Sequence, residues 1–101
     1  MIIEQGDVLF FAEAIPKTAT KAELENGIVE HGEATGHAHR LTARDFEYFE
    51  TPEKTRHLRL LKPIALKHEE HDPITLPPGE YRIGRVKEKG MFDDLIAPVV
   101  D

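Results

Sequence analysis

Six histidines are the residues of this chain whose type and spacing could do chemistry, and all of them fall between residues 31 and 71. They are His31, His37, His39, His57, His68 and His71. His37 and His39 form a His-x-His pair, and alternate residues of a β-strand project to the same face about 6.6–6.8 Å apart. That face continues to Leu41, whereas Arg40 and Thr42 point the other way, so the pair is predicted to face inward.

A second group of histidines follows at the end of another expected strand. Ile64, Leu66 and His68 share one face of that strand, and His71 lies in the turn that comes next. Three or four imidazoles can then converge at one end of a small barrel. The carboxylates nearest to them in sequence are Glu33, Asp45, Glu69 and Glu70.

Neutral imidazoles arranged in this way favour a divalent first-row metal ion. The predicted ligands are His37, His39, His68 and His71, and the predicted ion is zinc, nickel, iron or manganese. An open coordination position would lower the pKa of a bound water and supply a nucleophile near neutral pH. The first hypothesis is therefore a divalent-metal-binding β domain that supports hydrolysis or sensing of a small ligand.

The same histidines allow a reaction without metal. Two histidines beside a phosphodiester can act as general base and general acid, because their pKa values lie near neutrality. An arginine could neutralise the phosphate charge and a tyrosine could orient the substrate. The predicted catalytic residues are His37, His39, Arg40, Tyr81 and Arg82. The second hypothesis is thus a metal-independent phosphodiesterase or nuclease that acts on a small nucleotide or RNA.

In a third hypothesis the histidines have a structural role and catalyse no reaction. In a non-catalytic oligomeric interaction module they would hydrogen-bond to nearby carboxylates or backbone and satisfy buried polar groups. His57 is not expected to be a metal ligand, because it shares its face with Arg59 and lies opposite Leu58 and Leu60. We therefore expect His57 to be solvated.

Short β-type runs separated by turn residues position these side chains, and no apolar pattern at helical spacing reaches 12 residues. The predicted fold is all-β: a small single-domain barrel or sandwich over residues 1–101 with at most one short helix. The expected strands are 7–12, 27–30, 37–42, 46–50, 57–61, 64–68 and 81–86. The one candidate helix spans 20–26, where a strand fits nearly as well. Prolines and glycines between the runs mark turns.

Composition excludes several classes of protein. The 13 basic and 19 acidic side chains give a net charge of −6, which disfavours general nucleic-acid binding or a polybasic membrane contact. The chain has no cysteine, so any metal must sit on nitrogen and oxygen. It has neither a signal-peptide pattern nor an apolar run long enough for a membrane span, and we expect a cytoplasmic protein. The apolar residues of the tail, 87–101, are expected to pack on the domain or on a neighbouring subunit of a homo-oligomer.

One stretch of these residues resembles the cupin fold. Gly36-His37-Ala38-His39 is followed by a carboxylate-bearing strand and later by a Pro-x-Gly turn. The resemblance implies a metal site of His-x-His, a carboxylate and a further histidine, with Asp45 or Glu47 in the place of the usual glutamate. Here, however, His68 and His71 precede the Pro-x-Gly turn instead of following it.

A longer set of motifs resembles a small uncharacterised bacterial and phage family. The set comprises Gly6-Asp7-Val8-Leu9, the segment from Gly32 to Arg40 and the segment from His68 to Arg82. The resemblance implies a shared design around the histidines and no particular reaction. After Arg82 the chain departs from that family's usual ending.

Overall fold

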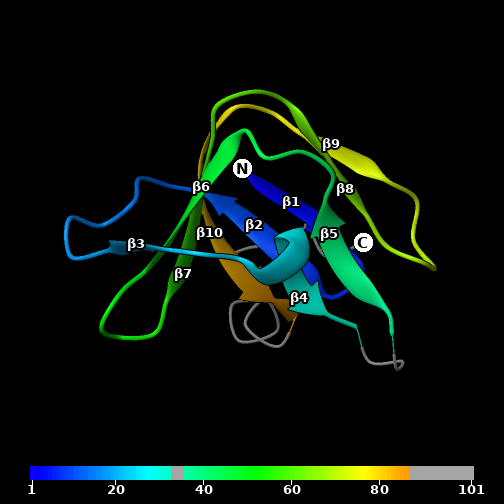
Figure 1. Cartoon of the computed structure of the whole chain (residues 1–101), viewed down its shortest axis with the longest axis horizontal. Helices are drawn as coiled ribbons and strands as arrows, with labels where there is room; N and C mark the ends of the chain where they lie inside the picture. The colour runs from blue at the N-terminus through cyan, green and yellow to red at the C-terminus, as the bar shows by residue number, and fades with distance from the viewer. Residues whose placement is uncertain (33–35, 87–101) are drawn as a thin grey trace.

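The structure is a computed structural model, and it describes residues 1–32 and 36–86. Glu33 and the tail over 87–101 lie outside the described residues. The elements in chain order are β1 (Ile2–Gln5), β2 (Val8–Ala12), β3 (Thr20–Ala22), the 3-10 helix η1 (Glu25–Gly27), β4 (Ile28–His31), β5 (Ala38–Leu41), β6 (Phe46–Glu50), β7 (Arg56–Leu60), β8 (Ile64–Lys67), β9 (Ile74–Leu76) and β10 (Gly79–Arg85) (Figure 1). The all-β prediction is confirmed.

The strands form two antiparallel sheets. One has the order β1-β2-β10-β7-β6-β3 and the other the order β4-β5-β8-β9. Apolar side chains of both sheets meet in one buried cluster, which includes Val8, Phe10, Leu58 and Tyr81 from the first sheet and Val29, Leu41, Ile64 and Leu66 from the second. Two sheets closed on a common core give the barrel-like or sandwich-like architecture that the sequence predicts.

The candidate helix over residues 20–26 is wrong. Its first three residues form β3, which pairs with the last three residues of β6 at the edge of the larger sheet. Asn26 then adopts a φ of 55°, which an α-helix does not accommodate. A seven-residue helix has to overcome its nucleation cost, whereas pairing with a sheet edge satisfies backbone groups directly. The alternative of a strand is correct for this short stretch.

Two short strands, β1 and β9, lie outside the strands expected from the sequence. Both are at the edge of a sheet. β9 lies between Pro73 and Pro77, which the sequence pattern assigns to turns. Proline is tolerated at sheet edges because the missing N–H faces away from the ladder. The two prolines therefore predict turns at this position, although an edge strand can form between them.

The expectation that His57 is solvated is also wrong, because its side chain is 1% exposed. β7 is an interior strand, and His57 pairs with Phe49 on one side and Arg82 on the other. Nε2 of His57 lies 2.8 Å from Oγ1 of Thr55, whereas Nδ1 has no hydrogen-bond partner among the residues that the structure describes. Burial holds the pKa of His57 below its ordinary value.

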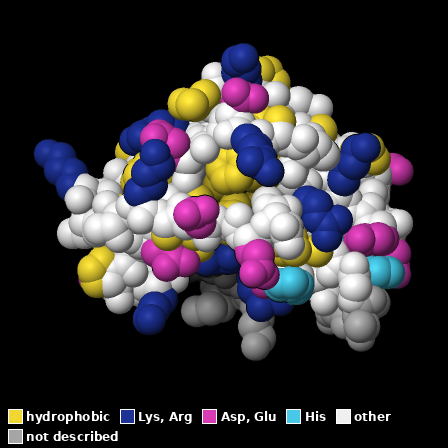
Figure 2. Space-filling model, viewed as in Figure 1, with side chains coloured by type: hydrophobic (Ala, Val, Ile, Leu, Met, Phe, Trp, Pro, Cys, Tyr) yellow, Lys and Arg dark blue, Asp and Glu magenta, His cyan; other side chains and the backbone are white. Residues whose placement is uncertain are grey.

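The surface carries mixed charge. Figure 2 shows acidic and basic side chains interspersed over the face drawn, with histidine exposed beside acidic groups at its lower edge. Among the ion pairs of the protein, Arg59 lies 2.8 Å from Glu47 and 3.0 Å from Glu80. Within residues 1–32 and 36–86, no helix has the length and apolar character needed to cross a membrane.

Three segments deliver side chains to one end of the fold. They are the turn between β1 and β2, the start of β5, and the connection between β8 and β9. On β5, His39 and Leu41 are buried while Arg40 is exposed, in agreement with the predicted alternation. β5 also pairs with β8 through Arg40 and Lys67, so the ends of these two strands lie side by side.

Candidate metal centre

Four imidazole rings meet where these three segments come together. The ring of His68 contacts the other three, with centroid distances of 4.3 Å to His39, 4.6 Å to His71 and 5.6 Å to His37. The rings of His39 and His71 stack at 6.0 Å. The structure therefore brings together the four histidines predicted as metal ligands.

Gln5, at the end of β1, has a buried amide whose hydrogen bonds are all assigned. Its Nε2 donates to the backbone oxygens of Leu66 and Asp72, each at 2.9 Å. These bonds use both N–H groups and fix the orientation of the amide. Its Oε1 therefore accepts, and the partner is Nδ1 of His39 at 2.8 Å. His39 consequently carries a hydrogen on Nδ1, and its neutral ring has the lone pair on Nε2.

The Nε2 atom of His39 lies 3.3 Å from Oδ1 of Asp7, in the turn between β1 and β2. The ring is 1% exposed. Burial, reinforced by nearby His68, holds the pKa of His39 below its ordinary value, although the contact with Asp7 acts in the opposite direction. An ion pair with Asp7 needs the protonated ring, whereas burial favours the neutral one. In the neutral state, a nitrogen lone pair faces a carboxylate oxygen.

His37 has its own carboxylate partner. Its Nδ1 lies 3.1 Å from Oε2 of Glu70, so a carboxylate faces this side of the ring. Metal-ligating histidines are commonly oriented by a carboxylate at the other ring nitrogen. His37, His68 and Glu69 each offer one ligand atom, and these three atoms lie within 4.8 Å of one another.

Glu69 is held in place by the backbone of β5. Its Oε1 accepts a hydrogen bond from the N–H of Ala38 at 2.9 Å. That bond is the main reason that the pKa of Glu69 is lowered. The carboxylate is therefore charged at neutral pH, and Oε2 is available as a ligand.

One ring nitrogen of His68 must become free before His68 can bind a metal ion. The backbone N–H of Glu70 donates to Nδ1 of His68 at 3.0 Å, so a neutral ring carries its own hydrogen on Nε2. A metal ion either displaces the Glu70 N–H from Nδ1 or replaces the proton on Nε2. The Glu70 contact is exposed, so water can take its place at little cost.

Three of the four rings, those of His37, His68 and His71, border a pocket of about 440 Å³ at the surface. Its lining consists of Gly6, Asp7, Gly32, His37, His68, Glu70 and His71. A Cβ on Gly6 would lie 2.5 Å from Nε2 of His71, and a Cβ on Gly32 would lie 2.9 Å from Nε2 of His68. The two glycines therefore leave room for the rings. Within the described part of the chain, neither lysine nor arginine lines the pocket.

The chain matches a protein family described as a domain of unknown function (DUF8820) over residues 4–86. It belongs to this family. Neither a curated protein nor a solved structure gave a match. Membership of an uncharacterised family is therefore confirmed, whereas the cupin resemblance stays a prediction. All four rings of the cluster lie inside the matched residues.

Of the two carboxylates that the cupin resemblance implies, Asp45 and Glu47, Glu47 does not reach the cluster. Glu47 is paired with Lys21 at 3.0 Å and with Arg59 at 2.8 Å, on the larger sheet. Its pKa is lowered chiefly by the bond from Arg59. The carboxylates beside the histidines are instead Asp7, Glu69 and Glu70.

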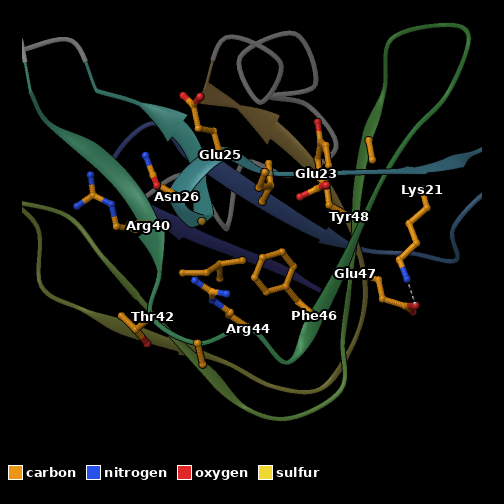
Figure 3. Close-up of a pocket in the computed structure, with 15 residues that line it drawn as sticks. Lys21, Glu23, Glu25, Asn26, Arg40, Thr42, Arg44, Phe46, Glu47 and Tyr48 are labelled. Carbon is orange, nitrogen blue, oxygen red and sulfur yellow. Dashed lines mark ion pairs between the residues drawn. The ribbon is translucent and has the colours of Figure 1, made fainter.

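Arg40 lies elsewhere. It lines a different pocket, of about 1000 Å³, formed by β3, η1, β5 and β6 together with the turn after β5 (Figure 3). Figure 3 shows Phe46 and Arg44 beside each other in this pocket, with Arg40 at its edge. The structure thus does not bring Arg40 to the rings of His37 and His39.

Tyr81 and Arg82 also have partners away from the histidines. The hydroxyl of buried Tyr81 donates to the backbone oxygen of Pro77 at 2.7 Å. Arg82 bonds to Glu13 at 2.9 Å, and its guanidinium lies 4.2 Å from the ring centroid of Phe11. Neither residue lines the pocket at the cluster.

Gln5 and Asp7 contact the histidine cluster, although the sequence did not predict them as part of the candidate site. A signal existed for Asp7, because a Gly-Asp turn between two apolar runs places a carboxylate at the end of a barrel. No local signal existed for Gln5. Its role depends on contacts with residues 61 and 67 positions away.

Proposed function

We propose that the histidine cluster binds a divalent transition-metal ion through His37, His68 and Glu69. The observation that carries the proposal is the proximity of their three ligand atoms, within 4.8 Å, combined with the carboxylate of Glu70 beside Nδ1 of His37. Ligands on a tetrahedral ion are roughly 3.3 Å apart when the bonds are about 2.0–2.1 Å. Since Glu69 is exposed and both rings are only partly buried, small side-chain rotations close this difference.

The donor set points to a particular group of ions. Two imidazoles and one carboxylate suit zinc, nickel, iron or manganese better than calcium or magnesium, which prefer all-oxygen sites. Within the described residues the pocket has acidic groups and no basic side chain of lysine or arginine, so its electrostatic character also favours a cation.

Hydrolysis of a small ligand is the reaction that such a site supports best. Three protein ligands leave room on the ion for water, and a divalent ion brings the pKa of that water toward neutrality. The pocket of about 440 Å³ is large enough for a small molecule beside the ion. Metal-independent phosphodiester cleavage gains no support, because Arg40 and Arg82 lie away from the rings. Assembly into a homo-oligomer stays a prediction.

The test begins with metal content. Tag-free protein purified without added metal is analysed for zinc, nickel, iron and manganese, before and after chelator treatment and incubation with each ion. We expect near-stoichiometric metal in the natural chain and loss of one ion per chain in His37→Ala. Loaded and chelator-treated protein are then compared for hydrolysis of p-nitrophenyl acetate and bis-p-nitrophenyl phosphate.

His31→Ala is the matched control, because His31 is an exposed histidine on β4 that does not line the pocket. It should retain metal and any activity. A natural chain that contains no metal and takes up none of the four ions would refute metal binding. Stoichiometric metal without metal-dependent hydrolysis would retain the binding site and refute the reaction.

A further inference from the structure

The larger pocket lies apart from the histidine cluster, where the chain crosses between the two sheets. The segment 23–27 leads from β3 to β4, and the segment 42–45 leads from β5 to β6. β3 pairs with β6 and β4 pairs with β5, but these two crossing segments are not joined by a strand ladder. Both of them line the pocket of about 1000 Å³, which shares no lining residue with the pocket at the rings (Figure 3).

The floor of this pocket is apolar. Leu41 and Tyr48 belong to the buried core, and Leu24, Ala43 and Phe46 are partly buried against it. Figure 3 shows the ring of Phe46 in the middle of the pocket. An aromatic or large apolar group of a ligand can therefore pack on this ring.

The two sides of the pocket carry opposite charges. Arg40 on β5 and Arg44 in the turn after β5 supply positive charge on one side. Glu23 and Glu25, on the segment 23–27, supply negative charge on the other. Within the residues that the structure describes, none of these four side chains has an ion pair or a side-chain hydrogen bond. Their charged groups are therefore available to a ligand.

This distribution of charge favours a ligand with a charge of each sign. Lys21 and Glu47, the other two charged residues of the lining, are paired with each other at 3.0 Å. The four unpaired groups sum to zero, so a simple anion or cation is attracted by one side and repelled by the other. A molecule with both a carboxylate and an ammonium group is attracted by both sides. Arginine can bind a carboxylate through two parallel hydrogen bonds, and glutamate accepts from an ammonium group.

We infer that this pocket binds a free α-amino acid with an aromatic or large apolar side chain. The carboxylate binds Arg40 and Arg44, the ammonium group binds Glu23 and Glu25, and the side chain packs on Phe46. A volume of about 1000 Å³ is enough for such a small molecule. The site uses neither the proposed metal nor its ligands, so it is tested separately from the proposed function.

The chain contains no tryptophan, so L-tryptophan is a selective optical probe. Full-length protein in chelator is titrated into L-tryptophan, and the fluorescence anisotropy of the ligand is measured with excitation that tyrosine does not absorb. The comparison ligands are tryptamine, which lacks the carboxylate, and N-acetyl-L-tryptophan, which lacks the ammonium group. We expect each to bind at least about tenfold more weakly than L-tryptophan, because each loses a charge-assisted hydrogen-bond partner.

Two variants test the two sides of the pocket. Arg44→Gln should weaken the binding of L-tryptophan about fivefold or more without weakening that of tryptamine. Glu25→Gln should weaken the binding of L-tryptophan by a similar factor without weakening that of N-acetyl-L-tryptophan. The controls are Lys62→Gln and Glu53→Gln, which remove a charge of each sign at exposed positions outside the pocket.

Amide NMR spectra of the natural chain locate the bound ligand. L-tryptophan should shift the signals of the segments 23–27 and 42–45 and leave those of the connection between β8 and β9 in place. Shifts confined to that connection would overturn the inference, as would the absence of binding at the solubility limit of L-tryptophan. Equal affinities for the three ligands, or equal losses in the pocket variants and their controls, would also contradict it. Tighter binding of either comparison ligand would show that the pocket recognises one charge only, and the amino acid would then be the wrong class of ligand.

Discussion

The side-chain oxygen of Gln5 accepts a hydrogen bond from Nδ1 of His39 at 2.8 Å. The nitrogen of the same amide donates to Leu66 and Asp72, which lie on the two sides of the connection that carries His68 and His71. One buried side chain therefore fixes both the tautomer of one ring and the position of the segment that supplies two others.

Gln5→Glu should weaken both the fold and metal binding. A carboxylate still accepts from His39, but it cannot donate to the oxygens of Leu66 and Asp72, which lose their partner. Leaving such groups unsatisfied is expected to lower the free energy of unfolding by at least about 2 kcal/mol. Zinc affinity should fall about 10–100-fold, as for other residues that orient metal ligands. Urea denaturation in chelator and calorimetry with Zn²⁺ measure the two effects.

Thr42→Val is the control for Gln5→Glu. Thr42 also donates from its side chain to a backbone oxygen, that of Ala65 at 3.0 Å, but this bond is exposed. Its loss should change the free energy of unfolding by no more than about 0.5 kcal/mol. Equal effects of the two variants would contradict a special role for Gln5.

The convergence of the histidines was predictable because it follows from local rules. Alternation along β5 places His39 with Leu41 on the buried face, and His68 follows the apolar face of β8. The contribution of Gln5 was not predictable, because it needs the pairing of β1 with β2 and the approach of the β8–β9 connection.

The burial of His57 was also not predictable from the sequence. Alternation correctly assigns its face but does not reveal whether that face is covered. The position of β7 between β10 and β6 places His57 between Arg82 and Phe49, and sheet order is a property of the whole chain. The same long-range order places the side chains of Arg40 and Tyr81 away from the histidines. In the sequence, Arg40 directly follows His39, and Tyr81 follows the turn at Pro77-Pro78-Gly79.

Gly6→Ala should disturb the metal site more than Gly36→Ala. Both glycines have positive φ, +59° and +83°, so alanine introduces backbone strain of about 1 kcal/mol at each. Of the two positions, only Gly6 would bring the new Cβ against a ring, since Nε2 of His71 would lie 2.5 Å away, whereas no atom of the described residues lies within 4 Å at Gly36. We expect both variants to lose similar stability in chelator.

The difference should appear on addition of Zn²⁺. The His71 ring packs against that of the proposed ligand His68 at a centroid distance of 4.6 Å, so its displacement in Gly6→Ala should reduce zinc affinity about tenfold, while Gly36→Ala should bind as the natural chain does. Calorimetric titration of both variants under the same conditions measures this. Unchanged zinc binding in Gly6→Ala would show that the His71 ring does not help to position His68.

Tyr81→Phe should reduce stability and leave metal binding unchanged. The hydroxyl of Tyr81 donates to the backbone oxygen of Pro77, and its burial raises the pKa of the phenol. Loss of this bond is expected to cost about 1–2 kcal/mol in the free energy of unfolding. Tyr48→Phe is a comparable control, because the hydroxyl of Tyr48 donates to Glu50 and burial raises its pKa to about 12. A loss of metal-dependent hydrolysis in Tyr81→Phe alone would restore Tyr81 as a catalytic residue.

The stability of the fold should decrease as the pH falls below about 6.5, in part because of His57. Burial lowers the pKa of this ring in the folded state, so between the folded and unfolded pKa values the unfolded chain binds more protons. The stabilising contribution is complete above the unfolded pKa of about 6.5 and is lost as the pH falls toward the folded pKa. One such proton gives a slope of up to about 1.4 kcal/mol per pH unit.

His57→Gln should reduce this slope, because glutamine cannot take up a proton. Free energies of unfolding are measured in urea at several pH values from 5 to 8, with chelator present so that metal makes no contribution. The slope should fall without vanishing, since burial also lowers the pKa of His39. His31→Gln is the matched control for the substitution, because His31 is exposed. If His57→Gln leaves the slope as it is in the natural chain, the unpartnered Nδ1 of His57 accepts a proton in the folded protein, and burial does not exclude the charged ring.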